Sequence, residues 1–536
     1  MKKIFTTFLL LPIFCLSQNK KPNILFIAID DLKPELGCYG NKLIKTPNID
    51  RLAKMGTVFN ANYCQQAVCG PTRASLMTGR RPDVTKIWDL RTQMREMNPD
   101  ILTIPQYLIS QGYTTSGIGK IYHPGCIDKK QDEPSWSIPY LKATVNDYPP
   151  ALGEPASKHY QLAATKEYFK KLKPAGPKPA LDEDAETSTI MGAADISTKG
   201  PAVENIDVPD NAYEDGANTL LAKKQLIALI KAGKPYFMAV GLHKPHLPFV
   251  APKKYWDMYN RKDMPIAEFQ EQAKNSPVIA YHNSSELRNY SDIPAFATIP
   301  SSAANRIGLK EEKQRELIHG YYAAVSYIDA QVGILLNTLE SLGELENTII
   351  ILWGDHGWHL GDHDLWTKHT NYEQAARAPL IIASPGLKPG KSNSMTEHLD
   401  IFPTICDLAK LPIPTQLEGK SLQPVMRDKK VSVKEYSVSQ YPRKLKKEEF
   451  TTLGYPNNKL MGYSMRTERY RYTIWMSDFT SKDPFSAKKI YATEMYDYQK
   501  DPLEKVNVVK DPGYTASSTI LYQKMVDYFK SQSRIK

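Results

Sequence analysis

Cysteine is scarce in this sequence, with six among 536 residues. One of them, Cys15, lies in the N-terminal segment MKKIFTTFLLLPIFCLS, in which Lys2 and Lys3 precede a short apolar run that ends in small or polar residues. This arrangement is typical of a secretory signal peptide, so we predict that residues 1–17 are removed and that the protein is exported, either to a periplasm or out of the cell. The five remaining cysteines are too few for a disulfide scaffold, and their odd number leaves at least one sulfur with another role.

Long hydrophobic runs are also missing. After the leader, no apolar stretch reaches the length of a transmembrane helix, so we expect no stable membrane insertion. There is no aromatic and basic motif for nucleic acid, and we expect no nucleic-acid partner. The formal net charge is +11, and removal of the two leader lysines leaves +9. This charge suits a polyanion, and export favours a sulfated or carboxylated polysaccharide over DNA; the alternative is that the charge serves solubility alone.

Short apolar runs indicate an α/β fold. Five of them are typical of strands buried on both faces of a sheet: residues 23–29, 114–118, 236–242, 348–353 and 379–384. Helical patterns lie between them, and the longest covers residues 310–341, with Gly343 as a stop signal. Alternating strands and helices predict a mostly parallel sheet flanked by helices.

The chain also divides by composition. Residues 171–210 are rich in Pro, Ala, Gly and acids, which predicts an irregular surface excursion. A second soft stretch, 443–459, separates the α/β part from a tyrosine-rich tail, where MGYSMRTERYRYTIWM alternates like one exposed antiparallel strand and residues 520–528 are expected to form a helix. We therefore predict an α/β catalytic domain over 18–443 and a C-terminal α+β subdomain over 444–536.

Charged residues and histidines follow four of the predicted strands. In open α/β sheets, ligands bind beyond the carboxyl ends of the strands. One such ending would be a helix cap or a solvated turn, but four of them favour a shared site. The residues are Asp30 and Asp31; Lys120 and His123; His243, Lys244 and His246; and Asp355 and His356.

The two acidic clusters indicate a metal site. They lie more than 300 residues apart in the sequence, and their carboxylates would repel one another without a neutralising cation. Carboxylate oxygens suit calcium or magnesium, whereas His356 also allows manganese or zinc. The alternative is that Asp31 caps a helix and His356 is a hydrogen-bonded turn residue.

The segment QQAVCGPTRASLMTGRRPD, residues 65–83, predicts a helix with an unusual start. Pro71 fits the first helical position and Gly79 the position just past the end. Cys69 would then lie beside the free N–H groups of the helix start, where anions bind, and Arg73 would point inward as a fork for an oxyanion. A thiolate at such a place would be acidified and reactive, so a thiol nucleophile is one interpretation; a structural cysteine is the other.

Cys69-Gly70-Pro71-Thr72-Arg73, followed by Thr78-Gly79-Arg80, resembles the C-x-P-x-R signature of the formylglycine-dependent sulfatase family. Within that family, DDLKPELGCYG, GKIYHPG, VGLHKPHLPF and GDHGWHLGDH look like segments of the iduronate-2-sulfatase branch, in the same order. The resemblance runs from about residue 22 to the C-terminal region and is weakest across 128–210 and 444–458. It implies an alkaline-phosphatase-like fold with a mixed sheet, a smaller C-terminal antiparallel sheet, and hydrolysis of sulfate esters.

The resemblance also implies roles for individual residues. A maturation enzyme would convert Cys69 to formylglycine, whose hydrate is the nucleophile. His243 would be the general acid for the leaving alcohol and His123 would take a proton as the intermediate collapses, and both are expected to titrate near neutrality. Three cations would surround the sulfate: Arg73, Lys120 and Lys368. One Ca²⁺ per chain would be held by Asp30, Asp31, Asp355, His356 and the modified Cys69.

For the sugar we predict contacts from Arg95, His246 and Trp358, because a uronate carboxylate suits an arginine and a pyranose face suits an aromatic ring. The implied substrate is a uronic-acid-containing sulfated polysaccharide or oligosaccharide, either a glycosaminoglycan or an ulvan-like algal glycan. Two alternatives stay open. One is a phosphatase or phosphodiesterase of the same fold, although such enzymes usually present Ser or Thr as nucleophile and hold two zinc ions; the other is a non-catalytic glycan-binding protein whose Cys69 remains a thiol.

Overall fold

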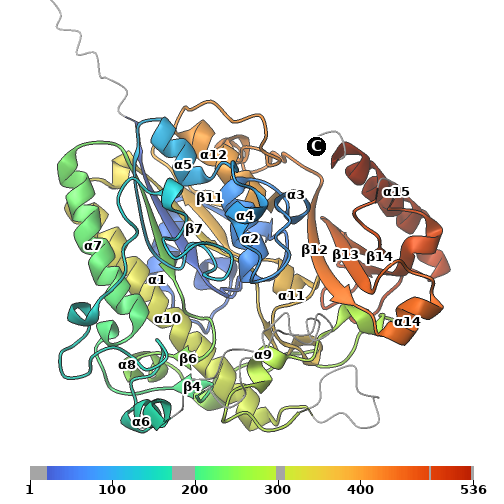
Figure 1. Ribbon diagram of the computed structural model, residues 1–536, viewed down its shortest axis with the longest axis horizontal. Coiled ribbons are helices and arrows are strands. Elements are labelled where there is room, and N and C mark those ends of the chain that lie inside the picture. The colour runs from blue at the N-terminus through green and yellow to red at the C-terminus, as the bar shows by residue number, and fades with distance from the viewer. Residues whose placement is uncertain (1–20, 172–199, 297–307, 482–483, 533–536) are drawn as a thin grey trace, which may run out of the picture.

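The computed structural model describes residues 21–171, 200–296, 308–481 and 484–532 (Figure 1). The predicted leader and most of the predicted excursion at 171–210 lie outside these ranges. Within the described part of the chain, no helix has both the length and the apolar character needed to cross a membrane.

A seven-stranded sheet forms the centre of the larger part of the molecule, in the order β11-β2-β10-β7-β1-β5-β3. Strand β1 is parallel to both of its neighbours, β5 is parallel to β3, and β2 is parallel to β11. Only β10, among the described strands of this sheet, is antiparallel to its neighbours. The strands are β1 (Asn23–Ile29), β2 (Thr57–Tyr63), β3 (Thr114–Gly119), β5 (Tyr236–Leu242), β7 (Thr348–Gly354), β10 (Leu380–Ala383) and β11 (Gly390–Glu397).

All five predicted strands are present, and the mixed, mostly parallel sheet is confirmed. Two strands of this sheet, β2 and β11, were not predicted from the sequence. β2 interrupts its apolar pattern with asparagines, and β11, GKSNSMTE, is largely polar because it is an edge strand whose first half alternates between buried and exposed positions.

Helices cover both faces of this sheet, as the alternation of side chains along β1 requires. Leu25, Ile27 and Ile29 join one apolar core with side chains of α1 (Pro47–Met55), α7 (Glu214–Ala232) and α10 (Glu311–Ser341). The intervening residues of β1 face a second core. That core is completed by α2 (Cys69–Thr78), α5 (Ile104–Ser110) and α12 (Ile401–Leu408) (Figure 1). The predicted helix at 310–341 is therefore α10.

A separate four-stranded antiparallel sheet, in the order β12-β13-β14-β15, follows in the chain, and α15 (Thr515–Gln532) packs on it. The smaller C-terminal antiparallel sheet is thus confirmed, and α15 contains the predicted helix at 520–528. Its strands are β12 (Tyr436–Lys444), β13 (Lys459–Thr467), β14 (Tyr470–Ser477) and β15 (Ile490–Asp497).

Two details of the tail differ from prediction. The alternating segment MGYSMRTERYRYTIWM is not one exposed strand but most of the hairpin β13–β14, and both strands are mainly buried because α15 and the larger domain cover their faces. The soft stretch 443–459 is the β12–β13 connection, with the short helix α14 (Lys447–Thr452), rather than a linker. Since β12 belongs to the small sheet, we propose a domain boundary before Tyr436 instead of after Arg443.

Candidate active site

Neighbouring strand ends bring the two predicted acidic clusters together. β1 and β7 pair in parallel along their whole length, so Asp30 and Asp31 emerge beside Asp355 and His356. The backbone N–H of Asp31 donates a hydrogen bond to Oδ1 of Asp355 over 2.9 Å. All four side chains are fully buried. Buried carboxylates require positive charge around them, so this edge of the sheet is built to hold cations.

Cys69 lies at the first residue of α2 and completes this cluster. The helix begins two residues before the predicted start at Pro71, whereas Gly79 is the left-handed C-cap with φ 65°, as predicted. The Sγ atom of Cys69 lies 3.4 Å from Nε2 of His356 and 3.9 Å from Oδ1 of Asp31. Ligand atoms of Asp31, Cys69, Asp355 and His356 all lie within 4.8 Å of one another. Two carboxylates, an imidazole and the side chain at 69 therefore fit a metal ion.

The thiol of Cys69 is not acidified, contrary to the expectation from the helix start. Burial raises the pKa of this thiol well above its usual range, and the carboxylate of Asp30 adds to the effect. Lys120 and Lys368 counteract it without reversing it. Burial, reinforced by Asp30, thus outweighs the two lysines, and an unmodified Cys69 is a protonated, weak nucleophile.

Three basic residues are arranged around the acids: Arg73, Lys120 and Lys368. Arg73 is fully buried, with Nη2 2.8 Å from Oδ1 of Asp30 and Nε 2.9 Å from Oδ2 of Asp355. Lys120 pairs with the other oxygen of Asp30. Arg73 therefore binds a carboxylate from each of the two strands, rather than presenting its guanidinium to the oxyanion of a ligand. Burial opposes ionisation of Asp30, but Lys120 and Arg73 outweigh it and hold its pKa well below the usual range.

Asp31 is less well compensated. The Nζ atom of Lys368 lies 2.9 and 3.1 Å from its two oxygens, yet burial raises the pKa of Asp31 to about 7, with Asp30 contributing in the same direction. The positive charge around Asp31 is thus too small to keep its carboxylate ionised in the usual range. A divalent cation bound among these ligands would supply the missing charge. This local charge deficit agrees with the metal fit.

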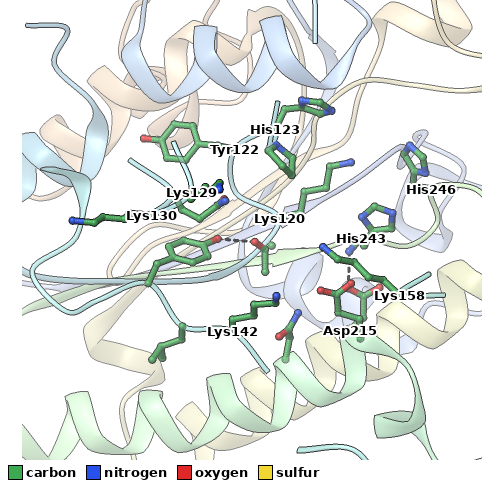
Figure 2. Close-up of a pocket in the computed structure, with 18 of the residues that line it drawn as sticks. Lys120, Tyr122, His123, Lys129, Lys130, Lys142, Lys158, Asp215, His243 and His246 are labelled. Carbon is green, nitrogen blue, oxygen red and sulfur yellow. Dashed lines mark hydrogen bonds between the residues drawn. The ribbon is translucent and has the colours of Figure 1, made fainter. Parts of the chain in front are cut away.

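A cavity of about 1000 Å³ opens beside the cluster. Figure 2 shows Lys120 and His123, which follow β3, beside His243 and His246, which follow β5. The Nε2 atom of His243 is buried and has no hydrogen-bond partner in the part of the chain that the structure describes. It is therefore available to an incoming ligand.

The two histidines predicted to move protons do not titrate near neutrality in this protein. Burial and the nearby Lys120 lower the pKa of His123 to about 3 and that of His243 well below its usual range. Both rings are therefore neutral at pH 7 in the absence of ligand. A bound sulfate ester brings a negative charge next to them and shifts their pKa values upward.

Two predicted sugar contacts are not brought to the cavity. Arg95 forms a two-pronged ion pair with Asp132, with N–O distances of 2.7 and 3.0 Å, and does not line the cavity. Trp358 is 1% exposed, and the Nζ atom of Lys368 lies 5.0 Å from the centre of its ring. Neither side chain lines the cavity in the part of the chain that the structure describes, so their sugar contacts stay predictions. His246 does line the cavity.

Sequence reasoning missed Glu286, which holds several site residues in place. It lies in the one-turn helix α9 (Ser285–Arg288) and is 3% exposed. Oε1 lies 3.2 Å from Nζ of Lys368 and 3.1 Å from Nε2 of His246, and Oε2 lies 3.3 Å from Nε2 of His369. No strand precedes Glu286 and its segment has no periodicity, so nothing in the sequence pattern marked it.

We predict that His359, three residues after His356, makes the free energy of unfolding depend on pH. It is fully buried in β8 (His359–Leu360), and burial lowers its pKa from 6.5 to about 3. The folded protein keeps His359 neutral, whereas the unfolded chain binds a proton below pH 6.5, so the free energy of unfolding falls as the pH drops from 6.5 towards 3. From pH 7.5 to 5.0 this residue contributes a loss of about 2 kcal/mol.

Urea unfolding of the native protein and of His359→Gln at both pH values measures this contribution. We expect the variant to lose about 2 kcal/mol less on acidification. Equal losses in the two proteins would contradict the assignment, because they would place the proton uptake on other groups.

The mixed α/β sheet with its small antiparallel companion agrees with the alkaline-phosphatase-like fold that the resemblance implied. A buried cluster of carboxylates lies at its strand ends, beside a cavity lined mainly by basic residues. Residues 22–411 match the family model for sulfatases, and residues 361–531 match that for the C-terminal region of N-sulphoglucosamine sulphohydrolase. The chain is 32% identical to iduronate 2-sulfatase of Mus musculus, over 91% of each protein. It belongs to the sulfatase family and is a sulfuric ester hydrolase, as its signature predicted.

Solved structures confirm the fold. A protein crystallised with D-glucosamine-2-N,6-O-disulfate superposes with a TM-score of 0.67 at 22% identity, covering 95% of this chain and 98% of that one. A phosphonate monoester hydrolase of Agrobacterium radiobacter superposes with the same TM-score at 21% identity, covering 95% and 96%. Members of the sulfatase family use a formylglycine and a metal ion, and this chain has a possible metal site formed by Asp31, Cys69, Asp355 and His356.

Proposed function

We propose that this protein is an exported sulfatase that removes sulfate esters from uronic-acid-containing sulfated glycans, either glycosaminoglycans or ulvan-like polysaccharides. The observation that carries the proposal is the position of Cys69: its Sγ lies among the metal-ligand set, 4.0 Å from Nζ of the cavity residue Lys120. A nucleophile at this position would lie beside the metal and close to a sulfate bound at Lys120. The predicted leader and the relationship to iduronate 2-sulfatase support the export and the substrate.

We assign the metal as one Ca²⁺, held by Asp30, Asp31, Asp355, His356 and the oxidised side chain of Cys69. The set is rich in hard oxygen ligands, which calcium prefers over softer sites. When bound, a divalent cation there would polarise the sulfate and lower the pKa of the attacking hydroxyl. Arg73 and Lys120 hold Asp30, and Lys368 holds Asp31, so the ligands keep their orientation.

The chemistry begins on formylglycine, made from Cys69 by a maturation enzyme. Water would add to the aldehyde and give a hydrate. One of its hydroxyl groups would release its proton to solvent, and the oxygen would attack sulfur while the sulfur–alcohol bond breaks. His243 donates a proton to the leaving alcohol, and Lys120 and Lys368 stabilise the negative charge on the sulfate oxygens. His123 then takes the proton of the second hydroxyl, the C–O bond to the sulfate breaks, and the aldehyde is restored. The net consumption is one water per ester.

Two readouts test this proposal on protein matured in its own host. Conversion of Cys69 to the aldehyde lowers the intact mass by about 18 Da. We expect fastest sulfate release from defined 2-O-sulfated uronate or sulfated algal oligosaccharides, with loss of activity after chelation and recovery with Ca²⁺.

Other outcomes would favour the alternatives. Faster release of phosphate than of sulfate from matched esters would indicate a phosphatase or phosphodiesterase. An unmodified thiol together with glycan binding and no turnover would indicate a binding protein. Restoration by Mg²⁺, Mn²⁺ or Zn²⁺ but not by Ca²⁺ would contradict the metal assignment alone.

A further inference from the structure

Three lysines line the cavity away from the acidic cluster: Lys129, Lys142 and Lys158. In Figure 2, Lys129 lies to the left of Lys120, Lys142 lies below it, and Lys158 lies to its right, next to His243. They come from a part of the chain, residues 128–158, where the resemblance to the sulfatase family is weakest. We call these three residues the lysine rim.

A residue near each lysine of the rim contacts a segment that carries a predicted site residue. Leu141, just before Lys142, donates its N–H to the carbonyl of Gly117 in β3 over 2.9 Å, and β3 leads directly to Lys120. Lys158 precedes His159, whose ring stacks on His243 with centroids 5.0 Å apart.

Lys129 lies three residues after Cys126, whose N–H donates to the carbonyl of His123 over 2.9 Å. The backbone therefore places all three lysines around the same reaction centre.

The charges of the rim are not neutralised by the protein. None of the three lysines forms an ion pair with another residue that the structure describes, whereas neighbouring Lys130 pairs with Glu133 over 2.7 Å. The carboxylate of Asp215 accepts the N–H groups of His243 and Lys244, over 2.6 and 2.9 Å.

Glu214 and Asp215 are then the acids of the cavity wall that form no ion pair with another described residue, against the three lysines of the rim. Uncompensated like charges around one cavity repel each other and attract anions.

The size of the cavity indicates how much ligand it admits. About 1000 Å³ is the upper end of the range of roughly 300–1,000 Å³ that is typical of small-molecule sites. A single sulfated sugar at Lys120, His123 and His243 would leave Lys129 and Lys142 of the rim without a ligand. The rim therefore faces the part of the substrate beyond the sugar that loses its sulfate.

We propose that the lysine rim is a second anion site, which binds a sulfate or carboxylate on a neighbouring sugar of the same chain. This rests on the proposed sulfatase function. The preferred substrate is then an oligosaccharide with at least two anionic sugars, and the lysines act by binding it rather than in the chemical step.

The test compares two substrates: an aryl sulfate with one negative charge and a sulfated uronate oligosaccharide with three or more. The test variant is the triple Lys129→Gln, Lys142→Gln, Lys158→Gln. Each exposed contact is worth little alone, so we expect the KM for the oligosaccharide to rise on the order of tenfold when all three are lost. The KM for the aryl sulfate should change far less, and the salt dependence of the oligosaccharide KM should weaken.

A matched control removes the same charge from the opposite edge of the sheet: Lys54→Gln, Lys231→Gln, Lys234→Gln, all exposed and located just before β2 or β5. Equal KM changes in the two triple variants would overturn the proposal, because net charge alone would then explain the effect.

The binding of the oligosaccharide to Cys69→Ala protein, with and without the rim substitutions, separates this proposal from the proposed function. A protein without turnover contradicts the proposed function, whereas unchanged affinity after loss of the rim contradicts the second anion site.

Discussion

Replacement of Cys69 by alanine is expected to lower kcat/KM for sulfate release by at least about 10⁴-fold, because removal of a covalent nucleophile leaves only the binding and charge stabilisation of the site. The substitution removes one sulfur from the first residue of α2 and leaves the clamp of Arg73 on Asp30 and Asp355 intact. We therefore expect the variant to fold and to retain oligosaccharide binding. Steady-state sulfate release and urea unfolding measure the two effects separately.

Cys406→Ala is the matched control. Cys406 is also buried, but it lies in α12 within the apolar core behind the sheet. We expect this variant to lose some stability through a small cavity while keeping its turnover. Turnover of Cys69→Ala within tenfold of the native protein would show that another group is the nucleophile.

Much of the site could be predicted because its chemistry stands at the ends of strands. Buried parallel strands are continuous apolar runs, so their ends are visible in the sequence, and the topology rule places those ends at one edge. On this basis the sequence alone groups four residues: Asp30, Asp31, Asp355 and His356. The signature around Cys69 added the candidate nucleophile.

The remaining features depend on long-range contacts that no local pattern encodes. Arg73 was expected to face an anion, but its two carboxylate partners arrive from β1 and β7 and take both sides of its guanidinium. Glu286 reaches Lys368 from a one-turn helix with no apolar periodicity. Trp358 follows the acidic strand end as a sugar-binding aromatic would, yet the chain turns its ring into the core.

The neutral state of the histidines likewise follows from burial and neighbouring lysines, which composition cannot reveal. His123 follows β3 and His243 follows β5, both at the carboxyl ends of the strands, as the sequence predicted. Burial, together with the charge of Lys120, lowers both pKa values and so determines when each ring carries a proton.

His243→Ala should separate substrates by their leaving groups. A sugar alcohol leaves poorly as an alkoxide and needs the proton of a general acid, whereas a nitrophenolate leaves without one. We expect sulfate release from a sugar ester to fall by about 10²–10⁴-fold and release from a nitrophenyl sulfate to fall less than about tenfold. A purely positional role of His243 would reduce both rates equally.

The pH profile gives a second measure of the same role. Burial and Lys120 lower the pKa of His243 well below its usual range. Only a small fraction of the free enzyme therefore carries this proton near neutrality, and that fraction grows as the pH falls. For the sugar ester, kcat/KM of the native enzyme should therefore increase as the pH is lowered from 8 towards 6, and His243→Ala should lose this slope. His319→Ala removes a buried imidazole that bonds to the carbonyl of Trp256, away from the cavity, and should retain the native profile. A slope that persists in His243→Ala would assign the proton donor to a different group, because the titrating acid would still be present.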